Sequence, residues 1–196
     1  MHEDELNYIK FMDGDIEGFE NLVLSYKNKL IFFIAKYVKD LHLAEDLAQD
    51  AFVEIYVHKE RFRMGNNFKT YLFTIGRNKA IDYIRKYGNE ISSDFISEDE
   101  FIIDMHSSFH TMSTIGGSEL ANDFLKKEEA KLVHSTMDKL KEEYRVVIHL
   151  IDFEQLSYKE AALIMKKTVP QIKILIHRAR KALGKVLLKE GYTYEE

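Results

Sequence analysis

The chain of 196 residues is long enough for two small domains, carries a net charge of −5 and contains no cysteine. The absence of cysteine excludes disulfides and thiol redox chemistry and is typical of proteins of a reducing cytoplasm. No apolar run approaches the roughly 20 residues of a membrane span, and the acidic start MHEDE lacks the order of a signal peptide. We therefore expect a cytoplasmic protein with no membrane span.

Charge is divided unevenly along the chain. Residues 91–125 hold seven acidic and no basic side chains, whereas the blocks on either side are more balanced. This stretch also collects serine and glycine, which loosen a backbone. Its apolar residues, such as Phe95 and Phe109, argue against a fully solvated tether. We predict two small domains, 1–90 and 126–196, joined by a flexible acidic linker over 91–125.

Helical periodicity dominates the N-terminal block, and no strand pattern competes with it. Asp15 can cap a helix whose apolar positions between Ile16 and Val38 repeat at three-four spacing. A further helix is expected from about His42 to Lys59, and another from about Phe68 to Tyr87. The sequence therefore predicts an all-α fold.

The helix expected over 42–59 presents an acidic side opposite its apolar stripe. No basic residue stands near these carboxylates along the helix, so we predict that they lack basic partners. A solvated face is the simpler interpretation, and a docking surface for a basic protein is the alternative. The carboxylates are those of Glu45, Asp46, Asp50 and Glu54.

The stretch from Arg61 to Lys86 interleaves aromatic rings with cations. It holds seven basic residues and a single acid, Asp82. Aromatic rings can stack on unpaired bases while cations hold the phosphate backbone. Contact with single-stranded DNA is one interpretation, and ordinary core packing of the apolar residues is the other.

The pattern over Leu156–Lys189 predicts a helix-turn-helix. Ser157 with Glu160, and Thr168 with Gln171, form two capping boxes eleven residues apart, so one short turn must join two helices. Eight Lys or Arg and no Asp or Glu occur between residues 161 and 189. A basic helix opposite an apolar face suits phosphates and base edges, which makes duplex DNA the expected ligand.

Three segments resemble the conserved regions of extracytoplasmic-function (ECF) sigma factors, the minimal two-domain specificity subunits of bacterial RNA polymerase. LAEDLAQDAFVEIY (43–56) resembles the polymerase-binding helix, and FKTYLFTIGRNKAIDYIRK (68–86) resembles the promoter-melting helix. The segment 140–180 resembles the region that binds the minus-thirty-five element. The resemblance implies an alternative sigma factor that binds core polymerase, directs it to specific promoters and helps melt the minus-ten element, without a catalytic site or cofactor of its own.

The resemblance also implies three sets of contact residues. The set for the clamp helices of the largest polymerase subunit is Glu45, Asp46, Gln49, Asp50 and Glu54. The set for the displaced strand at the minus-ten element is Arg61, Arg63, Asn66, Asn67, Lys69, Tyr71, Arg77, Asn78 and Lys79. The set for the minus-thirty-five duplex is Thr168, Gln171, Lys173, Ile174, His177, Arg178 and Lys181.

Further partners follow from the same resemblance. The C-terminal domain would sit on the flap of the second-largest polymerase subunit, and an anti-sigma factor would hold the protein inactive. The chain departs from the family pattern with Tyr71 where tryptophan is common and Ala161 where isoleucine is usual. Ile174 stands where a polar residue is common, so contact there would be apolar, for instance with a thymine methyl group.

Two other classes of protein remain as alternatives. A free-standing helix-turn-helix regulator would bind duplex DNA without polymerase, but it would leave the acidic and the basic-aromatic helices of the first domain unexplained. An enzyme could hold a metal at Asp104, His106 and His110, yet this segment has weak helix signals and no third histidine. We therefore expect no metal and no catalytic residues.

Overall fold

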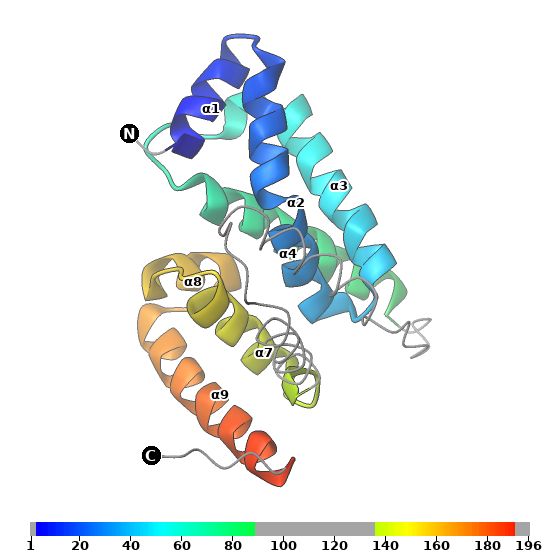
Figure 1. The fold of residues 1–196 in the computed structure, drawn as a ribbon, viewed down its shortest axis with the longest axis vertical. Coiled ribbons are helices and arrows are strands. Elements are labelled where there is room, and N and C mark those ends of the chain that lie inside the picture. The colour runs from blue at the N-terminus through cyan, green and yellow to red at the C-terminus, as the bar shows by residue number, and fades with distance from the viewer. Residues whose placement is uncertain (1–2, 89–135, 191–196) are drawn as a thin grey trace, which may run out of the picture.

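A computed structural model describes residues 3–88 and 136–190 of the chain. These residues form helices joined by short turns, and no strand occurs among them, which confirms the predicted all-α class (Figure 1). Within the described ranges, no helix combines the length and the apolar character that a membrane crossing requires. The predicted linker over 91–125, with Asp104, His106 and His110, lies outside the described residues.

The N-terminal unit consists of four α-helices and one 3-10 turn. Asp15 accepts a hydrogen bond from the backbone N–H of Glu17 (3.0 Å), and Asp40 accepts one from that of Leu43 (3.0 Å). These side-chain caps fix where the second and third helices begin. The elements are α1 (Glu3–Met12), α2 (Ile16–Val38), α3 (Leu41–Val57), η1 (Lys59–Arg61) and α4 (Phe68–Tyr87).

The core of this unit surrounds α2. Phe33 of α2 is fully buried, and its ring lies 4.8 Å from that of Phe73 in α4. Gly76 lets α4 approach α2 closely, because a Cβ at this position would lie 2.7 Å from Leu30 Cδ1. Tyr8 of α1 is buried and donates a hydrogen bond to the Lys59 carbonyl (2.7 Å), which ties α1 to η1 just after α3. The packing therefore holds α3 and α4 at fixed positions against α2.

The C-terminal unit contains the predicted helix-turn-helix. Both capping boxes form, and Lys166 adopts a left-handed conformation (φ 54°) in the turn between the two helices. Pro170 lies in the first turn of the last helix, where no intrahelical N–H partner is lost. The elements are α7 (Glu142–Ile148), the π-helical turn η2 (His149–Phe153), α8 (Tyr158–Met165) and α9 (Val169–Lys189).

The two units pack against each other in a closed arrangement. Figure 1 shows α8 alongside α4, and α7 also contacts α2. The buried guanidinium of Arg145 in α7 donates to the Lys36 carbonyl at the end of α2 (2.9 Å). The His149 ring lies 6.0 Å from the ring of Phe33. One apolar core therefore extends from the first unit into the second.

Candidate polymerase and promoter interfaces

The exposed side of α3 carries the centre of the predicted polymerase-binding set. Asp46, Gln49 and Asp50 are exposed and follow one another at helical spacing, because the opposite stripe of α3 is buried against α2 and α4. Among the described residues, neither Asp46 nor Asp50 has an ion-pair partner. This part of α3 can therefore offer two unneutralised carboxylates to a basic protein.

Two other carboxylates of the set are neutralised within the unit. Lys27 Nζ of α2 lies 2.9 Å from Glu45 Oε1, and Lys79 Nζ of α4 lies 2.8 Å from Glu54 Oε2. The prediction that the acidic side lacks basic partners is therefore wrong for Glu45 and Glu54. The partners stand on neighbouring helices, so the spacing of residues along α3 could not reveal them.

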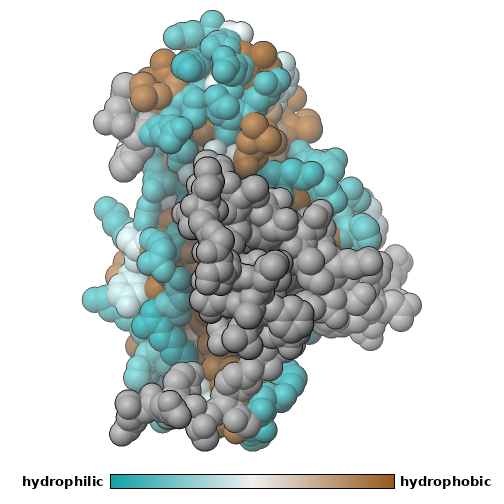
Figure 2. All heavy atoms as spheres, viewed as in Figure 1, coloured by the Kyte–Doolittle hydropathy of each residue, from teal (hydrophilic) through white to brown (hydrophobic). Residues whose placement is uncertain are grey.

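Exposed apolar side chains near this acidic side were missed by the sequence analysis. Val53 and Val57 of α3 are 59% and 60% exposed, and Leu24 of α2 is 81% exposed. Figure 2 shows apolar atoms at the surface of the end of the molecule where α1, α2 and α3 lie. Exposed apolar groups beside charged ones are typical of protein contact surfaces. Val53 could have indicated such a surface from the sequence, because this apolar residue falls outside the buried stripe of α3.

The predicted minus-ten residues begin in the loop that precedes α4. Arg61, Arg63 and Asn66 are exposed, and Gly65 adopts a positive φ of 85° that turns the chain toward α4. The Asn67 side chain caps α4 by accepting a hydrogen bond from the backbone N–H of Thr70 (3.2 Å). The loop therefore places polar and cationic groups together at the start of α4.

The remaining minus-ten residues lie on α4 and are partly buried. The Tyr71 ring packs 5.3 Å from that of Phe62, and burial is the main cause that raises the pKa of Tyr71. Burial also raises the pKa of Tyr37, an effect that the neighbouring guanidinium of Arg77 opposes. Asn78 is likewise partly buried. The core-packing interpretation is therefore confirmed for the apolar residues of this helix, such as Phe73, and contact with single-stranded DNA stays a prediction.

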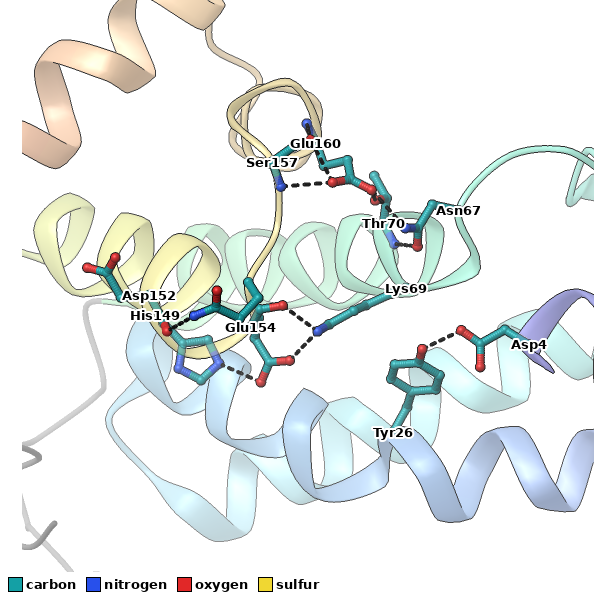
Figure 3. Close-up of polar contacts among 11 residues, drawn as sticks. Asp4, Tyr26, Asn67, Lys69, Thr70, His149, Asp152, Glu154, Ser157 and Glu160 are labelled. Atoms are coloured by element: carbon teal, nitrogen blue, oxygen red, sulfur yellow. Dashed lines mark hydrogen bonds and ion pairs between the residues drawn. The ribbon is translucent and has the colours of Figure 1, made fainter. Parts of the chain in front are cut away.

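Part of the minus-ten set is engaged by the C-terminal unit (Figure 3). Asn67 Nδ2 donates to Glu160 Oε1 (2.7 Å), and Thr70 Oγ1 lies within hydrogen-bond distance of the same oxygen (3.3 Å). Lys69 Nζ forms an ion pair with Glu154 Oε2 (2.6 Å) and donates to the Glu154 carbonyl (2.7 Å). We call these contacts of Asn67, Lys69 and Thr70 with Glu154 and Glu160 the seam.

The Glu160 carboxylate takes part in both the capping box of α8 and the seam, and both sets of hydrogen bonds affect its pKa. Its Oε2 accepts from the backbone N–H of Ser157 (2.8 Å) in the capping box, while its Oε1 faces Asn67 and Thr70. Burial disfavours the charged carboxyl, but the hydrogen bonds from Ser157, Thr70 and Asn67 outweigh it and lower the pKa of Glu160 below 4.5. At neutral pH the seam therefore contains an ionised carboxylate.

The predicted minus-thirty-five set lies on one open surface. Ile172, Ile176 and Ala179 bury the inner side of α9, which turns its other side to solvent. The side chains of the predicted minus-thirty-five set have no ion-pair partner within the described part of the chain, whereas Arg180 of the same helix pairs with Asp152. We call this surface the α9 face, and its residues, all exposed, are Thr168, Gln171, Lys173, Ile174, His177, Arg178 and Lys181.

Comparison with known proteins matches both units. The model of sigma-70 region 2 matches residues 22–90, and that of sigma-70 region 4 matches residues 130–183. The chain is 34% identical to the RNA polymerase sigma-H factor of Pseudomonas aeruginosa over 175 residues, which cover 89% of this chain and 88% of that protein. It is 30% identical to the ECF RNA polymerase sigma factor SigW of Bacillus subtilis, over 89% of this chain and 91% of the relative.

Solved structures share the fold. The sigma factor RpoE of Bartonella quintana, in complex with the anti-sigma factor NepR, is 26% identical with a TM-score of 0.62, over 86% of this chain and 96% of that one. CnrH, in complex with the cytosolic domain of CnrY, gives a TM-score of 0.65 at 24% identity, over 97% of this chain and 100% of that one. Together with the two curated relatives, these matches show that the chain belongs to the ECF RNA polymerase sigma factors.

Proposed function

We propose that this alternative sigma factor, which directs RNA polymerase to promoters, divides its contacts among three surfaces. The first is the exposed side of α3. Its unpaired carboxylates, Asp46 and Asp50, would bind the clamp helices of the largest polymerase subunit, with Gln49 between them. Glu45 and Glu54 would reach the same partner only by sharing or releasing Lys27 and Lys79. Asp46 and Asp50 therefore carry most of the charge of this contact.

The second surface is the loop over 61–67 with the start of α4, which we call the minus-ten surface. Its exposed cations, Arg61 and Arg63, would hold the phosphates of the displaced strand. Tyr71 offers the edge of a partly buried ring to an unstacked base. Lys69 and Asn67 carry hydrogen-bond donors for the same strand, although both are engaged in the seam.

The third surface is the α9 face, and it carries the proposal. All seven residues predicted from the sequence for the minus-thirty-five element lie exposed on one side of a capped helix. Lys173 and His177 lie one turn apart on this face, as a recognition helix in the major groove requires. A regulator acting without polymerase would use α9 in the same way but would leave the α3 carboxylates without a role.

An anti-sigma factor is a further partner that we propose. The sigma factor RpoE of Bartonella quintana, which shares this fold, was solved with the anti-sigma factor NepR. The exposed apolar residues Leu24, Val53 and Val57 beside the acidic side of α3 would suit a surface that binds different proteins in turn. We place these exchanges, and the contact with the polymerase flap, in the cytoplasm.

The experiment that tests this division is run-off transcription with core polymerase on a promoter library, together with measured affinity for core. Asp46→Lys with Asp50→Lys should weaken core binding roughly tenfold or more, because like charges across an interface cost several kcal/mol. The matched control is Asp13→Lys with Glu20→Lys, which makes the same charge change at exposed positions off α3. Equal core affinity of the two double variants would reject the α3 surface.

A further inference from the structure

The seam joins two carboxylates of the C-terminal unit to donors of the minus-ten surface. Figure 3 shows that Glu160 of α8 faces Asn67 and Thr70 at the start of α4. It also shows that Glu154, which precedes α8, faces Lys69 of α4. The Lys69 and Glu154 side chains are only 16% and 9% exposed, so this ion pair is largely withdrawn from solvent. The Asn67 amide, the Thr70 hydroxyl and the Lys69 ammonium group, which could contact DNA, are therefore already engaged with carboxylates of the C-terminal unit.

We propose that the seam is an autoinhibitory contact in which Glu154 and Glu160 occupy the places of promoter DNA on the minus-ten surface. The proposal rests on the proposed function of that surface. DNA presents phosphate oxygens and base acceptors to protein donors, and carboxylate oxygens are acceptors of the same kind. Because Lys69 and Asn67 cannot direct the same protons to both, closure of the seam and capture of the displaced strand exclude each other.

The dimensions of a promoter support the same conclusion. The minus-ten and minus-thirty-five elements lie about two and a half turns of duplex apart, which is on the order of 80 Å. In the closed arrangement α4 contacts α8, and α8 is joined to α9 by the short turn at Lys166. A small helical domain spans only about 30 Å. One molecule therefore cannot place α4 and α9 on both elements until the seam opens.

The seam is built so that it can open. Its contacts are a few directional hydrogen bonds and one ion pair, and a cleft of about 670 Å³ lies beside them between Tyr71, Thr74 and Leu163. Interfaces between domains of one chain resemble transient protein interfaces and permit relative motion. Opening the seam would also separate α7 from α2, which contact each other through Arg145 and the shared apolar core. Among the described elements, α3 packs mainly on α2 and α4, whereas α4 also contacts α8. Asp46, Gln49 and Asp50 of α3 stay exposed in the closed arrangement, so polymerase can approach α3 while the seam is closed.

The test uses the full chain with Glu154→Gln and Glu160→Gln combined. Glutamine preserves the capping box, since its single oxygen can still accept from Ser157, but it removes the charge and one acceptor from the seam. The matched control is Glu143→Gln with Glu190→Gln. These two carboxylates pair with Lys167 and Lys139 within the C-terminal unit, so the control removes the same charge without touching the seam.

Two readouts separate opening from DNA binding. The chain contains no cysteine, so Glu20→Cys and Lys189→Cys, both exposed and on different units, accept a dye pair that reports the distance between the units. Affinity for labelled single-stranded DNA of random sequence reports access to the minus-ten surface. We expect the seam variant to lower energy transfer and to bind single strands roughly three- to tenfold more tightly than the control, as the competent fraction rises.

The remaining outcomes overturn one proposal or the other. Unchanged energy transfer in the seam variant would show that these carboxylates do not hold the units together. Lower energy transfer without tighter DNA binding would show that closure does not mask the minus-ten surface. Lys69→Ala in the opened variant then decides whether that surface binds DNA at all, because an unchanged affinity would reject the proposed function of the surface and not the closure itself.

Discussion

The α9 face and the minus-ten surface are both prepared by a helix cap, yet they differ in what covers them. Thr168 begins α9 and Asn67 begins α4, each with its side chain accepting a backbone N–H of the first turn. The α9 face is exposed along its length, whereas the cap of α4 is also a partner of Glu160. The closed chain therefore leaves the residues proposed for duplex reading in solvent, while it engages those proposed for capture of the displaced strand.

With the proposed roles of the α9 face and the minus-ten surface, this difference would separate two steps of initiation within one molecule. Contact with duplex through α9 requires no rearrangement of the described residues, because its inner side is already packed. Contact with a displaced strand requires Lys69 and Asn67 to leave Glu154 and Glu160. Opening of the seam thus becomes a condition for melting but not for docking on duplex.

The largest effect is expected from breaking the closed arrangement at Arg145. Its buried guanidinium donates to the carbonyls of Lys36 and Leu140, so Arg145→Ala leaves both acceptors unsatisfied. We expect the free energy of unfolding to fall by about 3 kcal/mol. Chemical denaturation measures this loss, and exposed Arg178→Ala is the control, with a change within about 0.5 kcal/mol. Equal losses in both variants would contradict the structural role given to Arg145.

The next prediction concerns Tyr71 and the role of the minus-ten surface in promoter melting. Tyr71→Ala should impair open-complex formation more than closed-complex binding, because a lost base stack costs roughly 1–3 kcal/mol. Permanganate footprinting of polymerase complexes detects the unpaired bases. Tyr71→Phe keeps the ring and its packing on Phe62, and it should melt promoters almost normally. Normal melting by a folded Tyr71→Ala variant would place the strand elsewhere.

The role of α9 in reading duplex DNA is tested with substitutions at Lys173, His177 and Lys185. Lys173→Ala or His177→Ala should cost roughly 1–3 kcal/mol on the cognate duplex and little on scrambled DNA, because these residues would approach base edges. Lys185→Ala should weaken binding to both DNAs and lower the salt slope by about one unit, as a phosphate contact does. Salt titrations with both duplexes measure these differences. Equal losses on both DNAs for all three variants would make α9 a phosphate clamp only.

The smallest effect concerns the pH dependence of the seam. Hydrogen bonds lower the pKa of Glu160 below 4.5, so its stabilising contribution is present above that pH and is lost as the pH falls through the lowered value. Because this carboxyl is still partly exposed to solvent, which screens its charge, the contribution should not exceed a few tenths of a kcal/mol. The free energy of unfolding of the wild type and of Glu160→Gln should therefore converge on acidification. A gap that widens toward low pH would contradict the sign.

Local signals explain how much of the fold could be predicted from the sequence. The capping boxes at Ser157 and Thr168 predicted where α8 and α9 begin, and the turn between them forms as expected. The interval 68–87 matches α4 in both bounds. In each case the deciding interactions join residues three or four positions apart, so the sequence displays them directly.

Contacts between distant residues could not be predicted in this way. Lys27 and Lys79 neutralise carboxylates of α3 from other helices, although the acidic stripe gave no sign of a partner. Glu160 was identified as part of a capping box, but its second oxygen serves Asn67, 93 positions earlier in the chain. Such pairs depend on how the helices pack, and the spacing of residues within one helix carries no information about it.

The same separation of 93 residues between Asn67 and Glu160 has a consequence during translation. Ribosomes add about 5–20 residues per second, and N-terminal domains generally fold first. Asn67 is therefore added to the chain roughly 5–20 seconds before Glu160. During this interval each nascent molecule carries the donors of Asn67 and Lys69 without their later partners. A newly synthesised chain therefore passes through a state in which the seam has not yet formed.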